Sequence, residues 1–135
     1  RMALDYLNSH KDYNLPAEIK NEVFKCSHRD YSEGFYFGNP KQTLETSTPQ
    51  TDYEFVAIVV EDGKNGVAKV EMRNRFKAGE QLELLSKQKN NAIITIEHIW
   101  DEAGQTLQEC KVPKQIVAVK TNLDLKKFEI LRRKK

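Results

Sequence analysis

The chain has 135 residues, a hydrophobic content of 39%, a charged content of 31% and a formal net charge of +2. This length suits one domain with a substantial core, and no apolar run approaches the roughly 18 residues that a membrane helix needs. The weak net charge neither requires nor excludes nucleic acid as a partner. Without a signal peptide, and with Cys26 and Cys110 expected to be free thiols, the sequence predicts a cytoplasmic protein with no membrane partner.

Two short helices are predicted at the start of the chain. Residues 3–7 have apolar side chains at helical spacing with no capping residue before them, which indicates the tail of a longer protein. Pro16 suits the first position of a second helix. We assign residues 1–26 to a helical lead-in and residues 27–135 to a β domain.

Residues 25–40 contain an unusual concentration of aromatic side chains. Glycines flank Phe35, Tyr36 and Phe37, and they allow turns or close backbone approach. Such aromatic residues either anchor a loop to a core or form the floor of a recognition site. We expect Phe35 and Phe37, or Tyr36 alone, to pack under the β domain as a clamp.

Beyond a loop rich in Thr and Ser at residues 42–52, the apolar period changes to two. Strands are predicted at residues 53–60, 67–73, 82–84, 94–100, 116–119 and 125–131. Turns are predicted at residues 61–66, 78–80 and 101–104. Ile94, Ile96, His98 and Trp100 are expected to share one face. Short strands separated by glycine turns after two helices predict a mainly β fold, a small closed antiparallel β-barrel.

The sequence contains no nucleophile motif, phosphate loop or zinc spacing. We therefore predict no catalytic residue, no metal site and no cofactor in this chain. A proteolytic activity of the chain itself is not expected.

The most informative charges are Lys69, Arg73, Arg75 and Lys77, which run from a strand into the turn after it. With Arg29 and the last four residues, which are expected to be solvated, they are predicted to form a basic strip near Phe76 and Tyr36. Basic residues interleaved with aromatic ones suit single-stranded nucleic acid. The alternative is a solvated barrel face whose charges are balanced by Glu71, Glu80 and Glu83.

Two segments are long and unusual: residues 27–38, SHRDYSEGFYFG, and residues 67–76, VAKVEMRNRF, followed by GEQLE at residues 79–83. They resemble the C-terminal part of the collagenase-like peptidase family, peptidase family U-32. The resemblance implies a small β-barrel like the second domain of translation GTPases, after a catalytic domain whose signature motifs this chain lacks. It also implies a structural role for the motif residues, which are His28, Arg29, Tyr31, Gly34, Phe35, Tyr36, Phe37 and Gly38.

Members of that family are labelled as peptidases, and hence hydrolases, and some are implicated in hydroxylating tRNA or ribosomal RNA bases. We therefore expect a non-catalytic accessory domain that binds the substrate, with tRNA or rRNA as the partner. The candidate binding residues are Lys69, Arg73, Arg75, Lys77, Arg29 and Tyr36. The alternative is a structural module that docks on its own N-terminal catalytic domain, absent here, and stabilises it.

Overall fold

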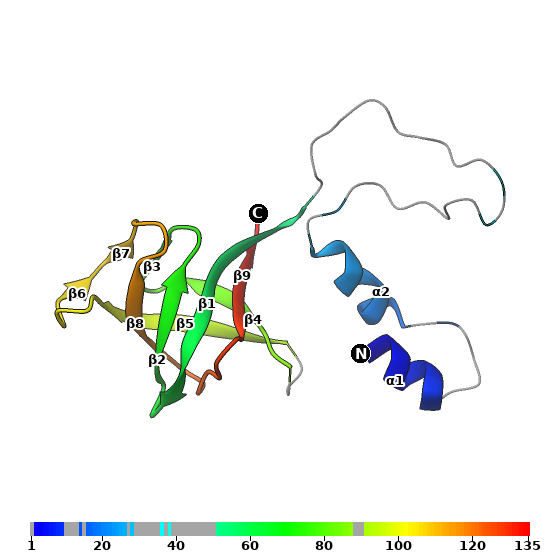
Figure 1. Cartoon of the computed structure of the whole chain (residues 1–135), viewed down its shortest axis with the longest axis horizontal. Coiled ribbons are helices and arrows are strands. Elements are labelled where there is room, and N and C mark those ends of the chain that lie inside the picture. Colours follow the sequence, from blue (N-terminus) through cyan, green and yellow to red (C-terminus); the bar gives the residue numbers. More distant parts are fainter. Residues whose placement is uncertain are drawn as a thin grey trace. The chain divides into compact units, whose positions relative to one another are not determined.

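The computed structural model describes residues 2–9, 14, 16–26, 28, 36, 38, 51–87 and 91–135 (Figure 1). The chain divides into two compact units, Arg1–Tyr53 and Glu54–Lys135. The predicted fold class is confirmed, because two short helices precede a closed antiparallel barrel. The domain boundary that the sequence places after Cys26 stays a prediction.

The first unit contains both predicted helices, α1 at Met2–Ser9 and α2 at Ala17–Phe24. The carbonyl oxygen of Pro16 accepts hydrogen bonds from the backbone N–H groups of Ile19 and Lys20, each at 3.1 Å, and so begins α2. No side chain of α2 is buried. Within the described residues, no helix is both long enough and apolar enough to cross a membrane.

Among the residues that the structure describes, the second unit contains nine strands. They are β1 Tyr53–Lys64, β2 Val67–Met72, β3 Phe76–Lys77, β4 Gln81–Leu85, β5 Ala92–Trp100, β6 Thr106–Leu107, β7 Glu109–Cys110, β8 Ile116–Thr121 and β9 Ile130–Lys134. Six of them follow the order β4-β9-β1-β2-β8-β5, and β5 pairs back with β4, so the barrel closes and leaves no free edge between these six. β6 extends β5 at one end, and β3 pairs with β7 in a separate small sheet.

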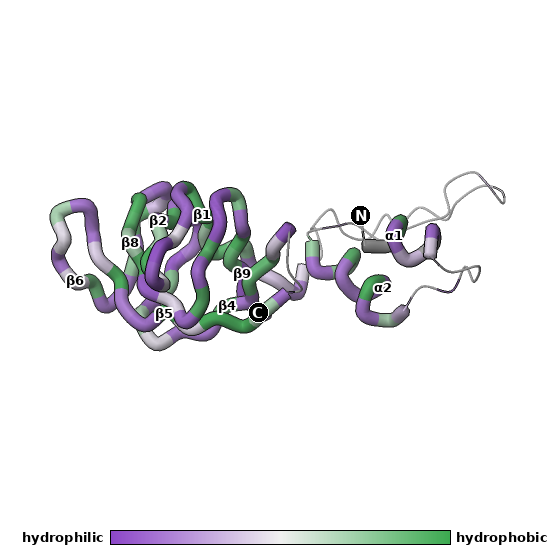
Figure 2. Tube along the Cα trace, turned by 90° about the horizontal axis from the view of Figure 1, so that it is seen from below, coloured by the Kyte–Doolittle hydropathy of each residue, from purple (hydrophilic) through white to green (hydrophobic). Residues whose placement is uncertain are grey.

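Alternate residues of the strands fill the barrel, as the period of two predicts. Hydrophobic and hydrophilic residues accordingly alternate along the barrel strands in Figure 2. The buried apolar residues are Val56, Ala57, Val59, Ala68, Val70, Met72, Phe76, Leu82, Leu84, Ile94, Ile96, Ile99, Cys110, Val117, Val119, Leu125 and Leu131. Each of the larger side chains contributes roughly 1.5–3 kcal/mol by leaving water.

A β-bulge in β5 corrects one predicted face. The pairing with β8 passes from Ile96 opposite Thr121 to His98 opposite Lys120, so one extra residue lies on β5. Beyond the bulge Ile99 is buried, whereas His98 is exposed and Trp100 is half-buried. Ile94 and Ile96 therefore do not share a face with His98 and Trp100.

The first hairpin turns later than predicted. β1 continues to Lys64, and the turn is made by Asn65 and Gly66 with φ angles of 54° and 76°. Positive φ at both central residues is the arrangement that Asn-Gly favours in two-residue hairpins. Gly63 lies in the strand instead, where a Cβ atom would come within 3.1 Å of Ala68 and of the Leu125 backbone.

The last strand is also displaced from its predicted position. Residues 125–129 form a turn in which the Glu129 N–H donates to the Lys126 carbonyl oxygen at 3.0 Å, and β9 begins only at Ile130. The expectation that the final four residues are all solvated is wrong, because Arg132 is 5% exposed and Arg133 is half-buried. Carboxylates at both sites, described below, allow these cations to lie in a strand.

Candidate nucleic-acid interface

Three of the four predicted basic residues of the second unit, Arg73, Arg75 and Lys77, lie at one end of the barrel, whereas Lys69 lies farther along β2, opposite Glu61 of β1. β1 is antiparallel to β2, and its start therefore lies beside the end of β2, toward the top of Figure 1. The Asn74 side chain donates to the Phe55 carbonyl oxygen at 2.8 Å and fixes this arrangement. β9 also finishes there, because Arg133 reaches Glu54 at the start of β1. We call Arg73, Arg75, Lys77, Lys134 and Lys135 the basic end.

Arg133 joins three segments at the basic end. Its guanidinium donates to Glu54, with Nε 2.8 Å from Oε2, and also to Glu80. The other carboxylate oxygen of Glu80 accepts the backbone N–H of Lys77 at 3.1 Å. Burial opposes the charge of Arg133, but the hydrogen bonds and the attraction of the two carboxylates outweigh it and raise the pKa of the guanidinium. Arg133 is therefore a structural cation.

Arg132 is engaged in the same way. It stands opposite Glu83 on β4, and the two side chains form a two-pronged pair with N···O distances of 3.2 and 3.3 Å. The exposed fractions are 6% for the Arg132 side chain and 12% for Glu83. A bidentate arginine–carboxylate pair of this kind is geometrically specific and holds two strands in register.

Two cations of the predicted strip, Lys69 and Arg73, have acidic partners. Lys69 pairs with Glu61 at 3.0 Å, and Arg73 pairs with Glu71 at 2.9 Å. Arg73 also lies over the Phe55 ring, with its Cζ atom 5.9 Å from the ring centroid. The cations of both pairs are exposed, and surface pairs of this kind contribute about 0–1 kcal/mol, so Lys69 and Arg73 can exchange their partners readily.

Four cations of the basic end are exposed and have no ion pair among the described residues: Arg75, Lys77, Lys134 and Lys135. The structure thus brings Arg75 and Lys77, both predicted from the sequence, to the same end as the two C-terminal lysines. A positively charged site with unpaired cations and an adjacent aromatic ring is chemically suited to phosphate.

Other predicted residues are described only in part. Arg29, Tyr31, Gly34, Phe35 and Phe37 lie outside the described residues. His28 is half-buried with its ring edge-on to Phe24 at 5.4 Å, and Gly38 has a φ of 134°, which favours glycine.

One aromatic residue differs from what the sequence suggested. Phe76 is 1% exposed, because its position opposite Cys110 turns it into the core and away from the basic strip. Tyr36 is 92% exposed, and its packing as a clamp under the β domain stays a prediction. The place of Arg29 and Tyr36 beside the strip stays a prediction.

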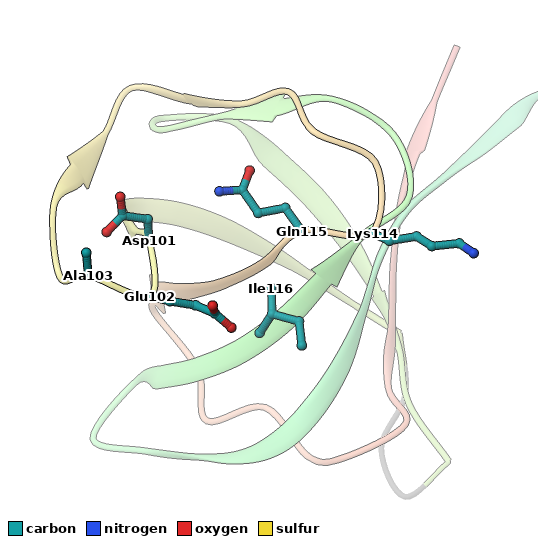
Figure 3. Close-up of a pocket in the computed structure, with 6 residues that line it drawn as sticks. All are labelled: Asp101, Glu102, Ala103, Lys114, Gln115 and Ile116. Carbon is teal, nitrogen blue, oxygen red and sulfur yellow. The ribbon is translucent and has the colours of Figure 1, made fainter.

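A pocket of about 460 Å³ lies between the turn after β5 and the start of β8 (Figure 3). Its lining residues are Asp101, Glu102, Ala103, Lys114, Gln115 and Ile116, which include neither a nucleophile nor a histidine. Asp101 accepts the Gln105 backbone N–H at 2.8 Å and so holds the turn. Figure 3 shows the Lys114 side chain pointing away from the pocket, which leaves two carboxylates to dominate it. This pocket is less suited to phosphate than the basic end.

The cysteines do not indicate a catalytic centre. Cys110 is fully buried, and desolvation raises the pKa of its thiol although a backbone hydrogen bond from Val112 acts the other way. Cys26 is exposed, and neither thiol is in a disulfide. The described part of the chain contains no group of three side chains able to hold a metal ion.

Comparisons with known proteins identify relatives of this chain. Residues 51–132 match the family described as the peptidase family U32 C-terminal domain. The chain is 30% identical over 134 residues to tRNA hydroxylation protein P1 of Bacillus subtilis (strain 168). This alignment covers 96% of the chain but 32% of the relative, so the chain spans about a third of that protein's length.

Two solved structures support the same relationship. Both are crystal structures of the C-terminal domain of a Geobacillus thermoleovorans protein described as a U32 peptidase. The selenomethionine variant is 33% identical with a TM-score of 0.55, and it covers 59% of this chain and 99% of its own. The other is 35% identical with a TM-score of 0.54, and it covers 61% of this chain and 92% of its own.

Proposed function

Because this chain belongs to the family of U32 peptidase C-terminal domains, we propose that it is a non-catalytic accessory domain that binds RNA. The first candidate ligand is tRNA, since the Bacillus subtilis relative is a tRNA hydroxylation protein. The domain presents the RNA to a catalytic domain of the same protein, in the cytoplasm. The observation that carries the proposal is the basic end, with its exposed and unpaired Arg75, Lys77, Lys134 and Lys135.

The distribution of charge supports this choice of ligand. Residues 54–135 contain 16 Lys and Arg against 12 Asp and Glu, a formal charge of +4, whereas residues 1–53 contain 6 against 8, a formal charge of −2. The positive charge thus belongs to the barrel. Because phosphate contacts dominate nucleic-acid affinity, cations without acidic partners are the residues that RNA engages first.

A titration of labelled tRNA with the full 135-residue chain at increasing salt tests the proposal. Each phosphate contact contributes a slope of about −0.7 to the logarithmic salt plot for single strands, so four contacts give about −3. Changing Arg75→Ala and Lys77→Ala together should flatten the slope by about 1.4, by the same rule. Absence of binding at low salt, even at high protein concentration, would exclude RNA as the ligand of this domain.

A matched control separates these two cations from bulk charge. Lys69→Ala with Lys120→Ala removes the same charge, but Lys69 pairs with Glu61 at 3.0 Å and Lys120 faces Glu97 at 3.9 Å. The control should change the slope clearly less than the Arg75 and Lys77 variant does. An equal change in both variants would indicate diffuse attraction to the whole barrel rather than binding at the basic end.

The second candidate function is a structural module that docks on the catalytic domain. It is favoured by two exposed apolar side chains of the barrel unit, Ile93 at 60% and Val112 at 59%. The docking function predicts that the chain retains a separately expressed catalytic domain in a pull-down, and that Ile93→Ser with Val112→Ser weakens this association. If the double serine variant retains the catalytic domain as well as the wild type does, Ile93 and Val112 no longer support the docking function.

A further inference from the structure

An exposed aromatic side chain lies at the end of the barrel opposite the basic end. Phe128 belongs to the connection between β8 and β9, at the bottom of Figure 1, and is 69% exposed. Its φ angle is 73°, in the left-handed region that bulky residues rarely adopt. A residue persists there only where its surroundings enforce the conformation, and such residues are concentrated at binding sites.

Hydrogen bonds to β1 enforce the conformation of Phe128. Its backbone N–H donates to the Val59 carbonyl oxygen at 2.8 Å, and the Lys127 N–H donates to the Asp62 carboxylate at 2.7 Å. The buried Glu129 carboxylate accepts the Lys126 N–H at 2.7 Å and closes the turn from its other side. The ring is therefore held outward by a fixed backbone, which reduces the entropy that a ligand would have to remove.

One cation lies over this ring, and a second is found at the same end of the barrel. The Lys127 ammonium lies 5.2 Å from the ring centroid, and Lys64 is exposed at the same end of the barrel. Neither lysine has an ion pair within the part of the chain that the structure describes. Lysine is depleted at protein–protein interfaces, whereas aromatic rings next to cations are typical of sites for single-stranded nucleic acid.

We propose that Phe128 stacks on an unpaired RNA base while Lys127 and Lys64 contact the flanking phosphates. This inference rests on the proposed RNA-binding function and adds a second contact to it. The two contacts lie roughly 13 to 23 Å apart along β1, since Val59 is four and Asp62 seven residues from Phe55 at about 3.3 Å each. An RNA that reaches both must run along the outer face of β1 in a single-stranded or flexible region.

Phe128→Gly is the most informative variant, because glycine accepts the positive φ and removes only the ring. Its melting temperature should not fall, while its affinity for a short single-stranded RNA should fall roughly 5- to 100-fold, the range for loss of one base stack. The salt slope should stay unchanged, because stacking releases no counterions. Phe128→Tyr should bind like the wild type, and so should Ile93→Ala, which trims another exposed apolar side chain.

A fluorescent base gives an independent readout. With 2-aminopurine in the RNA, binding of the wild-type chain should quench the fluorescence by stacking, and Phe128→Gly should abolish that quenching. If Phe128→Gly keeps its affinity while Arg75→Ala with Lys77→Ala flattens the salt slope, RNA binding stands and stacking on Phe128 is wrong. If the wild-type chain binds no RNA at low salt, both proposals fall.

Discussion

Two sets of cations meet at one end of the barrel, and they differ in what surrounds them. Arg132 and Arg133 lie in β9 and are held by Glu83, Glu54 and Glu80. Arg75, Lys77, Lys134 and Lys135 are exposed and have no acidic partner in the described residues. The sequence RRKK at the C-terminus reads as one basic run, but its first half is structural and its second half is available to a ligand.

The position of β9 explains this division. β9 lies between β4 and β1, and each arginine contacts one of these neighbours: Arg132 reaches Glu83 on β4 and Arg133 reaches Glu54 on β1. The planar guanidinium suits such carboxylate pairs better than a lysine ammonium does. Charge count alone therefore predicts neither stability nor binding, whereas burial and partners do.

The largest effect should come from Arg132→Met. This change leaves Glu83, whose side chain is 12% exposed, without its guanidinium, and breaking a buried pair in this way costs about 3–5 kcal/mol. Chemical denaturation measures the loss of unfolding free energy. Combining it with Glu83→Leu should recover much of the loss, since an apolar pair can replace a buried ion pair. A loss under about 1 kcal/mol for the single variant would make Arg132 a solvated cation after all.

A smaller effect is expected from Arg133→Met, at about 1–2 kcal/mol. The guanidinium loses two carboxylate partners, but its side chain is 30% exposed and solvent screens part of the interaction. The same denaturation experiment measures it. A loss of unfolding free energy equal to that of Arg132→Met would mean that burial does not decide which arginine contributes more to stability.

The smallest effect on stability should come from Arg75→Ala combined with Lys77→Ala. Neither side chain has an ion pair in the described part of the chain, and exposed substitutions of this kind usually stay within about 0.5 kcal/mol. Thermal and chemical unfolding should both match the wild type. A loss above about 1 kcal/mol would assign these residues to the structural set and weaken the comparison.

Much of the barrel could be predicted from the alternation of apolar residues. Ala68, Val70 and Met72 are all buried on one face of β2, as their spacing indicates. The bulge at Ile96–His98 could not be predicted, because one inserted residue reverses every later side chain without changing composition. The two-residue strands β3, β6 and β7 are too short to show any period.

The candidate site was predictable only in its exposed part. Arg75 and Lys77 are exposed, as their polar surroundings suggest. The burial of Arg132 was not predictable, because its partner Glu83 lies 49 residues away and only barrel closure brings them together. Phe128 was assigned to a strand, since neither its composition nor its neighbours signal a positive φ at an aromatic residue.

The meeting of the first and last strands also sets a condition on synthesis by the ribosome. β1 cannot pair with β9 until the ribosome has synthesised β9, which lies at the far end of the same domain. Until residues 130–134 have left the exit tunnel, β1 and β4 both present unpaired backbone groups to other nascent chains. The edges of β1 and β4 are therefore the places where an unfinished barrel can pair wrongly with another chain.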